Sequence, residues 1–455
     1  MIRSHGCSKT KPPNSVSNHQ ECTMLYERKN ITILTTLILL LSFALITGKG
    51  VSAAEIALNT GAVGNFPSVS GSIIAFTTYE SDAFVDLNKD GAMNDFMIRY
   101  YNVSDKSLVN TGLMGGIIGI RRAMQQLGQV IGEGPSVSGS VITYTSYEYW
   151  YYKEPFITRG MYGLNGDLNG DGDWNDYVIQ YYDFLDGSSG NTRAEGRFPC
   201  ISGSIIVFSI NEYKVDKDLN GDGDKDDYVI HYYDLSNKHL VNIGMVGGSR
   251  EEGPTVSGSI IAFTVYEGSV NKDLNSDGDK NDYVIHYYDI LRKDLVNTGA
   301  VGGVREEGPS VNGSIIAFTT HESGAGEDLN GDGDKNDYVI RYYDITNKSI
   351  VNTGAVGRLP SVSGSIIAFV SHEDSAGKDL NGDGDKDDYV IHYYNISKKH
   401  FVNTGVVGGS REEGPSVSGS VIAFATHEGG VDKDLNGDGD KHDSVIQYIV
   451  VQDKN

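Results

Sequence analysis

The sequence is poor in cysteine, proline and basic residues. Three cysteines in 455 residues are too few for a disulfide-built scaffold. The 37 lysines and arginines are outnumbered by 61 aspartates and glutamates, which gives a formal charge of −24. This balance argues against a nucleic-acid partner, because phosphate contacts need clustered basic side chains. After residue 53 no apolar run is long enough to span a bilayer.

Glycine and tyrosine are abundant instead. The chain has 57 glycines and 28 tyrosines against only 10 prolines, and 39% of its residues are hydrophobic. Many glycines between β-branched and aromatic stretches indicate many turns between short strands. The composition is that of a globular chain rather than a disordered one. We therefore expect an all-β protein.

The N-terminal segment is typical of an export signal. Arg28 and Lys29 precede a run of 17 residues without a charge, 31–47, and small residues follow at 51–54. This order predicts a secretory signal peptide and a secreted or cell-surface protein. An uncleaved anchor is the alternative, since a span needs about 17–25 residues. We assign residues 1–53 to an N-terminal extension and signal, starting at Met1 or Met24, and residues 54–455 to one domain.

Seven repeats occupy the rest of the chain. Each repeat contains an apolar run, an acidic loop, a second run rich in tyrosine and, in most copies, a Val-Asn-Thr-Gly stretch. With a short strand at a Pro-x-x-x-Gly phrase, this order predicts four strands per repeat. Seven such units favour a seven-bladed β-propeller of four-stranded antiparallel blades, with a linear β-solenoid as the alternative. The phrases begin at Pro67, Pro135, Pro199, Pro254, Pro309, Pro360 and Pro415.

The two ends of the repeated region distinguish these architectures. The seventh repeat stops at Val450 and Val451 without its last strand, whereas residues 58–64 match residues 351–357 almost letter for letter. The first strand of the mature chain is therefore predicted to complete the last blade. This arrangement closes the ring and leaves no free edge, whereas an open solenoid has no use for the permutation.

The blade phrase also resembles a known group of proteins. Pro-Ser-Val-Ser-Gly-Ser-Ile-Ile-Ala-Phe, as at residues 67–76, is similar to the blades of TolB-like and WD-type propellers, and the resemblance covers residues 55–455. It implies an architecture and no single function, because propellers host binding modules and enzymes alike.

Each repeat carries one acidic loop between its second and third strands. Oxygen-bearing side chains stand at loop positions 1, 3, 5, 9 and 10, and glycine stands at position 6. Ca²⁺ takes six to eight oxygen ligands, and the glycine allows the sharp turn that brings them together. We therefore predict up to seven structural Ca²⁺ ions, with the backbone carbonyl of position 7 as a further ligand. The predicted side-chain ligands are Asp86, Asn88, Asp90, Asn94, Asp95, Asp167, Asn169, Asp171, Asn175, Asp176, Asp218, Asn220, Asp222, Asp226, Asp227, Asp273, Asn275, Asp277, Asn281, Asp282, Asp328, Asn330, Asp332, Asn336, Asp337, Asp379, Asn381, Asp383, Asp387, Asp388, Asp434, Asn436, Asp438 and Asp443.

These loops resemble the calcium loops of EF-hands, dockerins and integrin-type FG-GAP propellers, with one departure. Position 12 is apolar, as at Met97 and Val178, where an EF-hand has a bidentate glutamate, and no flanking helices are predicted. The remaining ligand of the calcium coordination shell is predicted to be either the aspartate at position 10, which we favour, or a glutamate six residues before the loop. That glutamate is Glu80, Glu212, Glu267, Glu322, Glu373 and Glu428, with Glu148 displaced by an insertion.

A solvated hairpin without metal is the alternative for these loops. Repulsion between carboxylates a few ångströms apart argues against it. The seventh loop fits least well, because His442 replaces the oxygen at position 9. We expect an extracellular range of affinity, on the order of 10⁻⁴ to 10⁻³ M.

The second repeat departs from the others through an insertion at residues 149–165. Exposed aromatic side chains stack on sugars or extended peptides, so this repeat is a candidate site for an extracellular glycan or protein, and structural cover is the alternative. The candidate ligand-binding residues are Tyr149, Trp150, Tyr151, Tyr152 and Trp174.

No catalytic motif stands out, because every carboxylate-rich position recurs in each repeat. We therefore predict a monomeric binding or adhesion module. The alternatives are a glycan hydrolase or lyase with Glu148 and Glu154 as acids, and a purely structural envelope protein. His231, His286 and His392 share one mid-strand position with Arg99, Gln180, Arg341 and Gln447, which predicts a polar strand face rather than a ligand set.

Overall fold

The computed structural model describes residues 56–118, 132–148, 166–249, 252–303 and 307–452. All of them belong to the unit Glu55–Asn455. Strands dominate this unit, and the helices among the described residues are single turns of four residues. None of those helices has the length or the apolar character that a membrane crossing requires.

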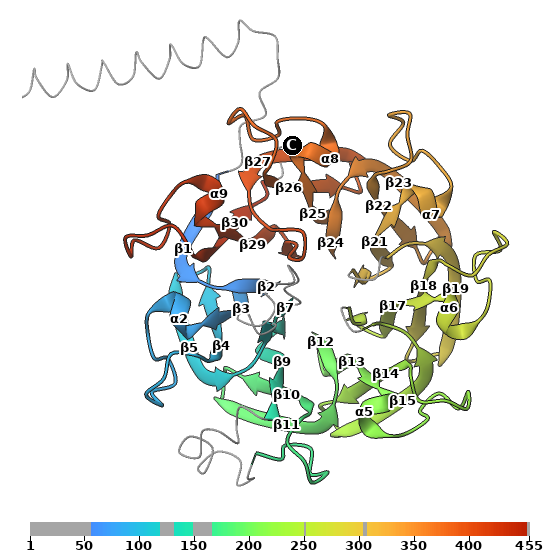
Figure 1. Cartoon of the computed structure of the whole chain (residues 1–455), viewed down its shortest axis with the longest axis horizontal. Coiled ribbons are helices and arrows are strands. Elements are labelled where there is room, and N and C mark those ends of the chain that lie inside the picture. The colour runs from blue at the N-terminus through green and yellow to red at the C-terminus, as the bar shows by residue number, and fades with distance from the viewer. Residues whose placement is uncertain (1–55, 119–131, 149–165, 250–251, 304–306, 453–455) are drawn as a thin grey trace, which may run out of the picture. The chain divides into compact units, whose positions relative to one another are not determined.

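Seven four-stranded antiparallel sheets form a ring, which confirms the predicted propeller (Figure 1). In blades 1 to 6 the strands follow chain order from the centre outward, so that β2, β12 and β24 lie innermost (Figure 1). The strands are β2 (Asn65–Ser70), β3 (Ile73–Tyr79), β4 (Phe96–Asn102) and β5 (Ser107–Met114) in blade 1; β8 (Ser136–Ser138), β9 (Val141–Tyr147), β10 (Tyr177–Asp183) and β11 (Ser188–Glu195) in blade 2; β12 (Arg197–Ser202), β13 (Ile205–Asn211), β14 (Tyr228–Asp234) and β15 (His239–Val246) in blade 3; β16 (Thr255–Ser257), β17 (Ile260–Tyr266), β18 (Tyr283–Asp289) and β19 (Asp294–Val301) in blade 4; β20 (Ser310–Asn312), β21 (Ile315–His321), β22 (Tyr338–Asp344) and β23 (Ser349–Val356) in blade 5; and β24 (Arg358–Ser363), β25 (Ile366–His372), β26 (Tyr389–Asn395) and β27 (His400–Val407) in blade 6. A separate two-stranded sheet pairs β6 (Ile117–Ile118) with β7 (Gly132–Glu133).

Blade 7 is closed by the first strand of the described chain, as the terminal match predicts. It consists of β28 (Ser416–Ser418), β29 (Val421–His427), β30 (Ser444–Val450) and β1 (Leu58–Val63). β1 runs antiparallel to β30, with Leu58 opposite Tyr448 and Val63 opposite Val445. The ring is therefore held shut by backbone hydrogen bonds between the two ends of the unit.

Single helical turns precede the acidic loops, where only strands were predicted. They follow the second strand of the blade and begin at the glutamate that the sequence analysis noted. A left-handed residue ends each turn, such as Asp216 after α5 with φ of 51°. The turns are α2 (Glu80–Ala83), α5 (Glu212–Val215), α6 (Glu267–Val270), α7 (Glu322–Ala325), α8 (Glu373–Ala376) and α9 (Glu428–Val431).

The hydrophobic core lies between neighbouring blades. One buried cluster joins Ile285 and Tyr287 of blade 4 to Ile316 and Phe318 of blade 5. A phenylalanine equivalent to Phe318 is fully buried in six of the seven blades, and Tyr144 takes its place in blade 2. Its ring lies against the glycine that ends the outer strand of the preceding blade, such as Gly302.

Replacing Gly302 by alanine is expected to destabilise the protein. A β-carbon at this position would overlap the ring of Phe318, and overpacking of a core typically costs about 1–3 kcal/mol. Gly430→Ala in α9 is the matched control, because its β-carbon would meet only Asp388 Oδ1, at 3.8 Å. Urea unfolding of both variants measures the difference, and equal midpoints would contradict this packing.

The mid-strand histidines are buried rather than exposed on a polar strand face, which corrects that prediction. His392 is 0% exposed, and its ring stacks on Phe369 with centroids 5.7 Å apart. The strand position of His392 faces the contact between neighbouring blades. Polar residues at this position therefore do not point toward solvent. Burial lowers the pKa of His392 to about 4, so it is neutral at physiological pH.

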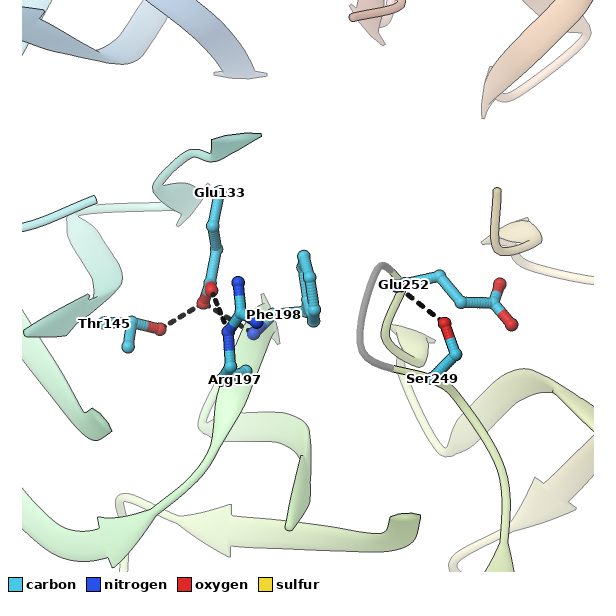
Figure 2. A network of polar contacts seen from close by, with 6 residues as sticks. All are labelled: Glu133, Thr145, Arg197, Phe198, Ser249 and Glu252. Atoms are coloured by element: carbon cyan, nitrogen blue, oxygen red, sulfur yellow. Dashed lines mark hydrogen bonds and ion pairs between the residues drawn. The ribbon is translucent and has the colours of Figure 1, made fainter. Parts of the chain in front are cut away.

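Buried glutamates in the longer connections join neighbouring blades at their inner strands (Figure 2). Glu133, before the inner strand of blade 2, accepts hydrogen bonds from Arg197 Nε at 3.1 Å and from the backbone N–H of Phe198 at 2.5 Å in blade 3 (Figure 2). Glu307 of blade 5 likewise pairs with Arg358 and accepts from the N–H of Leu359 at 3.1 Å. These charge-assisted contacts tie blade 2 to blade 3 and blade 5 to blade 6.

Glu252 departs from this arrangement. It is 4% exposed, its N–H donates to Ser249 Oγ at 3.2 Å (Figure 2), and its Oε1 pairs with Thr264. Its Oε2 has no hydrogen-bond partner. The next blade brings Glu307 toward it rather than an arginine, and burial raises the pKa of Glu252 well above its ordinary value. Among the described residues, this seam therefore holds a carboxyl oxygen without a hydrogen-bond partner.

Candidate metal centres in the blades

A buried glutamate organises each acidic loop, as blade 6 shows. Glu373 is 0% exposed and starts α8. Its Oε1 accepts hydrogen bonds from the N–H groups of Leu380 at 2.5 Å and Asn381 at 3.1 Å, and its Oε2 accepts from that of Asp388 at 3.3 Å. The corresponding glutamate makes the same three contacts in the other six blades, including Glu148 despite the insertion.

Side-chain oxygens at odd positions then fold the loop. Asp379, at position 1, accepts from the N–H groups of Gly382 at 2.6 Å and Gly384 at 3.1 Å. Asn381 Oδ1 accepts from the N–H of Asp383 at 2.9 Å. Gly384, at position 6, has a φ of 112°, which residues with a side chain rarely adopt. The fixed glycine and the alternating Asp and Asn are therefore required by the turn itself.

The folded loop brings carboxylates together. In blade 6, ligand atoms of Glu373, Asp383, Asp385 and Asp388 all lie within 4.8 Å of one another. Four other blades show the same glutamate with the aspartates of positions 7 and 10, within the same limit. Those groups are Glu148, Asp173 and Asp176; Glu212, Asp224 and Asp227; Glu267, Asp279 and Asp282; and Glu322, Asp334 and Asp337. Each group has the donor set for a hard cation.

The carboxylates that lie together include some of the predicted ligands. Position 10 is present as predicted, and the preceding glutamate joins it rather than standing apart as a strand terminator. The carboxylate of position 7 also lies in these groups, and the backbone carbonyl of that position stays a predicted ligand. The aspartates at positions 1 and 9 belong to none of these five groups, which consist only of aspartates and glutamates. At position 9, the Asp387 N–H donates to Asp385 Oδ1 at 3.2 Å, and Asp387 itself is exposed.

An asparagine amide lies among the carboxylates. Asn381 Nδ2 donates to Asp383 Oδ2 at 3.1 Å and to Asp388 Oδ2 at 2.7 Å. The amide thus holds the carboxylates of positions 5 and 10 through its donor side. An amide group can present either its NH₂ or its oxygen by rotation, so the same side chain can serve as a ligand.

Burial and crowding raise the pKa of the position-10 aspartate. Burial is the largest cause, and the nearby position-5 carboxyl adds to it, so that the pKa of Asp227 and of Asp443 rises to about 7. The pKa values of the corresponding aspartates in the other blades are raised as well. A cation among these groups would favour their ionised form and relieve this cost.

The outer strand of each blade is hydrogen-bonded to the acidic loop through an asparagine. This contact was not predicted from the sequence. Asn403, in the Val-Asn-Thr-Gly stretch of β27, donates from Nδ2 to the Leu380 carbonyl at loop position 2, at 2.7 Å. The other blades repeat the contact. In blade 7 the donor is Asn59 of β1, which reaches the Leu435 carbonyl at 2.6 Å. The recurring Asn was the available signal.

The predicted aromatic site is only partly within the described residues. Tyr149, Trp150, Tyr151, Tyr152 and Glu154 lie outside them. Trp174 occupies position 8 of the blade 2 loop and is 41% exposed. Glu148, the other candidate acid, belongs to the metal group of blade 2 and makes the contacts of its counterparts. Its position and contacts therefore match those of the other loop glutamates.

Comparison with protein-family models finds no match, and comparison with curated proteins finds none either. Among solved structures, the chain is similar to the β-propeller domain of the Trilobed protease from Pyrococcus furiosus, with 8% identity, coverage of 80% of this chain and 91% of that one, and a TM-score of 0.47. It is similar to TolB from Acinetobacter baumannii, with 15% identity, coverage of 79% and 76%, and a TM-score of 0.36. An oligogalacturonate lyase in complex with manganese shows 8% identity, coverage of 88% and 95%, and a TM-score of 0.48. Similarities this distant carry no functional argument, so the propeller architecture rests on the strand pairing above.

Proposed function

We propose that this chain is a calcium-stabilised β-propeller that serves as a binding or adhesion module outside the cell. The observation that carries the proposal is the recurrence of one carboxylate group, formed by the preceding glutamate and loop positions 7 and 10, in blade after blade. Several carboxylates within 4.8 Å of one another repel strongly without a cation. Calcium fits because every available donor is an oxygen and Ca²⁺ accepts a flexible coordination geometry.

A binding role is favoured over catalysis by the same repetition. Catalysis needs acid and base groups in environments that differ from each other. Here the acidic groups are near copies, and the candidate acid Glu148 is one of them. The run of uncharged residues 31–47 after Arg28 and Lys29 supports export. Extracellular calcium would then keep weak sites occupied.

Calcium is expected to raise the melting temperature of the full chain. A site with a Kd of about 10⁻³ M contributes about 1.4 kcal/mol at about 10 mM Ca²⁺. Several loops together therefore predict a Tm higher by several degrees than in EDTA, with little effect of Mg²⁺, which dehydrates reluctantly. Differential scanning calorimetry measures the shift, and elemental analysis counts the bound metal. No shift together with no bound calcium would refute the proposal.

Two variants of blade 6 distinguish calcium ligands from neighbouring carboxylates that do not bind the ion. Asp388→Asn removes a carboxylate from the group and is expected to lower the bound calcium by one ion per chain. Asp387→Asn changes the exposed neighbour at position 9 and is the matched control. If Asp387→Asn lowered the count instead, the ligands would be those predicted from the loop pattern alone.

A further inference from the structure

The outer strand of blade 2 departs from its counterparts at one buried position. β11 ends in Glu195, whereas the corresponding residue is apolar in the other six blades. Glu195 is 8% exposed, and its Oε2 has no hydrogen-bond partner. A buried carboxyl oxygen without a partner is costly, since it loses its hydration without replacement. The apolar counterparts are Val63, Met114, Val246, Val301, Val356 and Val407.

Blade 4 shows what this position faces. A β-carbon added to Gly324 would lie 3.4 Å from Asp282 Oδ1, in the loop of blade 4, and 3.6 Å from Val301 Cγ1. Asp282 and Val301 therefore border the same small space. The equivalents in blade 2 are Asp176 for Asp282 and Glu195 for Val301. The side chain of Glu195 therefore lies toward the acidic loop of its own blade.

The electrostatics of Glu195 agree with this placement. Burial is the main cause that raises the pKa of Glu195 to about 8, and the charge of Asp176 is the next. Asp171 and Glu148 of the same loop raise it further, while Lys214 lowers it. Asp176 and Glu148 belong to the carboxylate group of blade 2. Glu195 thus places one more carboxyl group beside that group.

Lys214 donates no hydrogen bond to Glu195 Oε2. It replaces the Gly324 equivalent in α5 of blade 3, and its Nζ donates to Asn175 O at 3.3 Å and Asn175 Oδ1 at 3.0 Å. The lysine is therefore held by loop position 9, and Glu195 Oε2 keeps no hydrogen-bond partner.

We propose that blade 2 holds a higher-affinity divalent-cation site than blades 3 to 6, with Glu195 supplying an additional carboxylate toward the ion. The inference rests on the proposed function, in which the loops bind Ca²⁺. The affinity of oxygen-ligand calcium sites increases with the number of charged ligands. A bound cation also supplies the partner that Glu195 Oε2 lacks. The unfavourable free energy of burying the carboxyl group is therefore offset only when the site is filled.

Trp174 provides a selective probe, because it stands at position 8 of this loop and the chain has only one other tryptophan. Tb³⁺ binds to calcium loops and emits when a nearby tryptophan is excited. In full-length chains carrying Trp150→Phe, titration with Tb³⁺ reports blade 2, and competition with Ca²⁺ gives the calcium affinity. Glu195→Gln and Glu195→Val are each expected to weaken binding about tenfold. An unchanged affinity in both variants would overturn the inference.

A reverse variant makes the same test in blade 4. Lys280 is at position 8 of that loop, so Lys280→Trp with Trp150→Phe and Trp174→Phe moves the probe there. Adding Val301→Glu is expected to tighten Tb³⁺ binding, and no change counts against the inference. If Ca²⁺ raises the Tm of all these chains but Glu195 has no effect on affinity, only this inference fails. If no loop binds Tb³⁺ and Ca²⁺ leaves the Tm unchanged, the proposed function fails too.

Discussion

Deletion of residues 1–64 is expected to lower the stability of the propeller by on the order of 5 kcal/mol, because β1 is the outer strand of blade 7. The truncation removes Ala62, which is 1% exposed and packs in the cluster that contains Phe76 and Ile446. It also removes the hydrogen bond from Thr60 Oγ1 to the Ile446 carbonyl, at 2.6 Å.

The truncation also exposes the edge of β30, which pairs with β1 in the intact unit. A long unpaired edge is a template for association with other chains. We therefore expect larger species in size-exclusion chromatography as well as a lower Tm. A chain that lacks only residues 1–54 is the matched control, and it keeps all of β1. Equal stability of the two truncations would contradict the closure of the ring by β1.

Replacing glutamate by glutamine is expected to have opposite effects on stability at two neighbouring contacts between blades. Glu307→Gln leaves Arg358, whose side chain is 17% exposed, without its carboxylate. Loss of one partner from a buried ion pair costs about 3–5 kcal/mol. Glu252→Gln instead keeps the size of a side chain whose Oε2 has no hydrogen-bond partner among the described residues. This second variant is expected to be as stable as the parent or more stable.

The pH dependence distinguishes the two variants further. Burial raises the pKa of Glu252 well above its ordinary value of 4.5. The folded protein therefore keeps a proton that the unfolded chain releases, and stability falls as the pH rises above about 4.5. Glu252→Gln lacks this loss, so its advantage over the parent should grow from pH 5 to pH 8.

Urea unfolding of the parent, Glu252→Gln and Glu307→Gln at a series of pH values measures both effects. The two substitutions make the same chemical change in equivalent connections, so each is the control for the other. A destabilised Glu252→Gln at pH 8, or an unaffected Glu307→Gln, would contradict the assigned contacts.

The seam at Glu252 follows from the number of blades. Blades 1, 3 and 6 are entered by short connections that bring Asn65, Arg197 and Arg358, whereas the others are entered by longer ones with a buried glutamate. The glutamate of one blade pairs with the short connection of the next, as Glu413 does with the N–H of Phe66 at 2.6 Å across the closure. Seven is odd, so strict alternation around the ring is impossible. Two glutamate connections must meet, and they do so at Glu252 and Glu307.

The sequence by itself determined the architecture of this protein. Four strands per repeat, seven repeats and the closing strand at residues 58–63 could all be predicted, because strands, turns and repeat lengths depend on local patterns. The acidic loops were equally visible, since glycine at position 6 and oxygen donors at regular offsets are local requirements of the turn.

Only the tertiary structure decided which of these groups meet. Glu373 joins the loop from a helical turn outside it, and the folded loop brings the carboxylates of Asp385 and Asp388 near it. Glu195 approaches from the neighbouring strand β11, His392 is buried against Phe369, and Glu252 Oε2 has no hydrogen-bond partner among the described residues. Most of these contacts join different elements of the fold, and their geometry is set by strand pairing and blade packing rather than by local spacing alone.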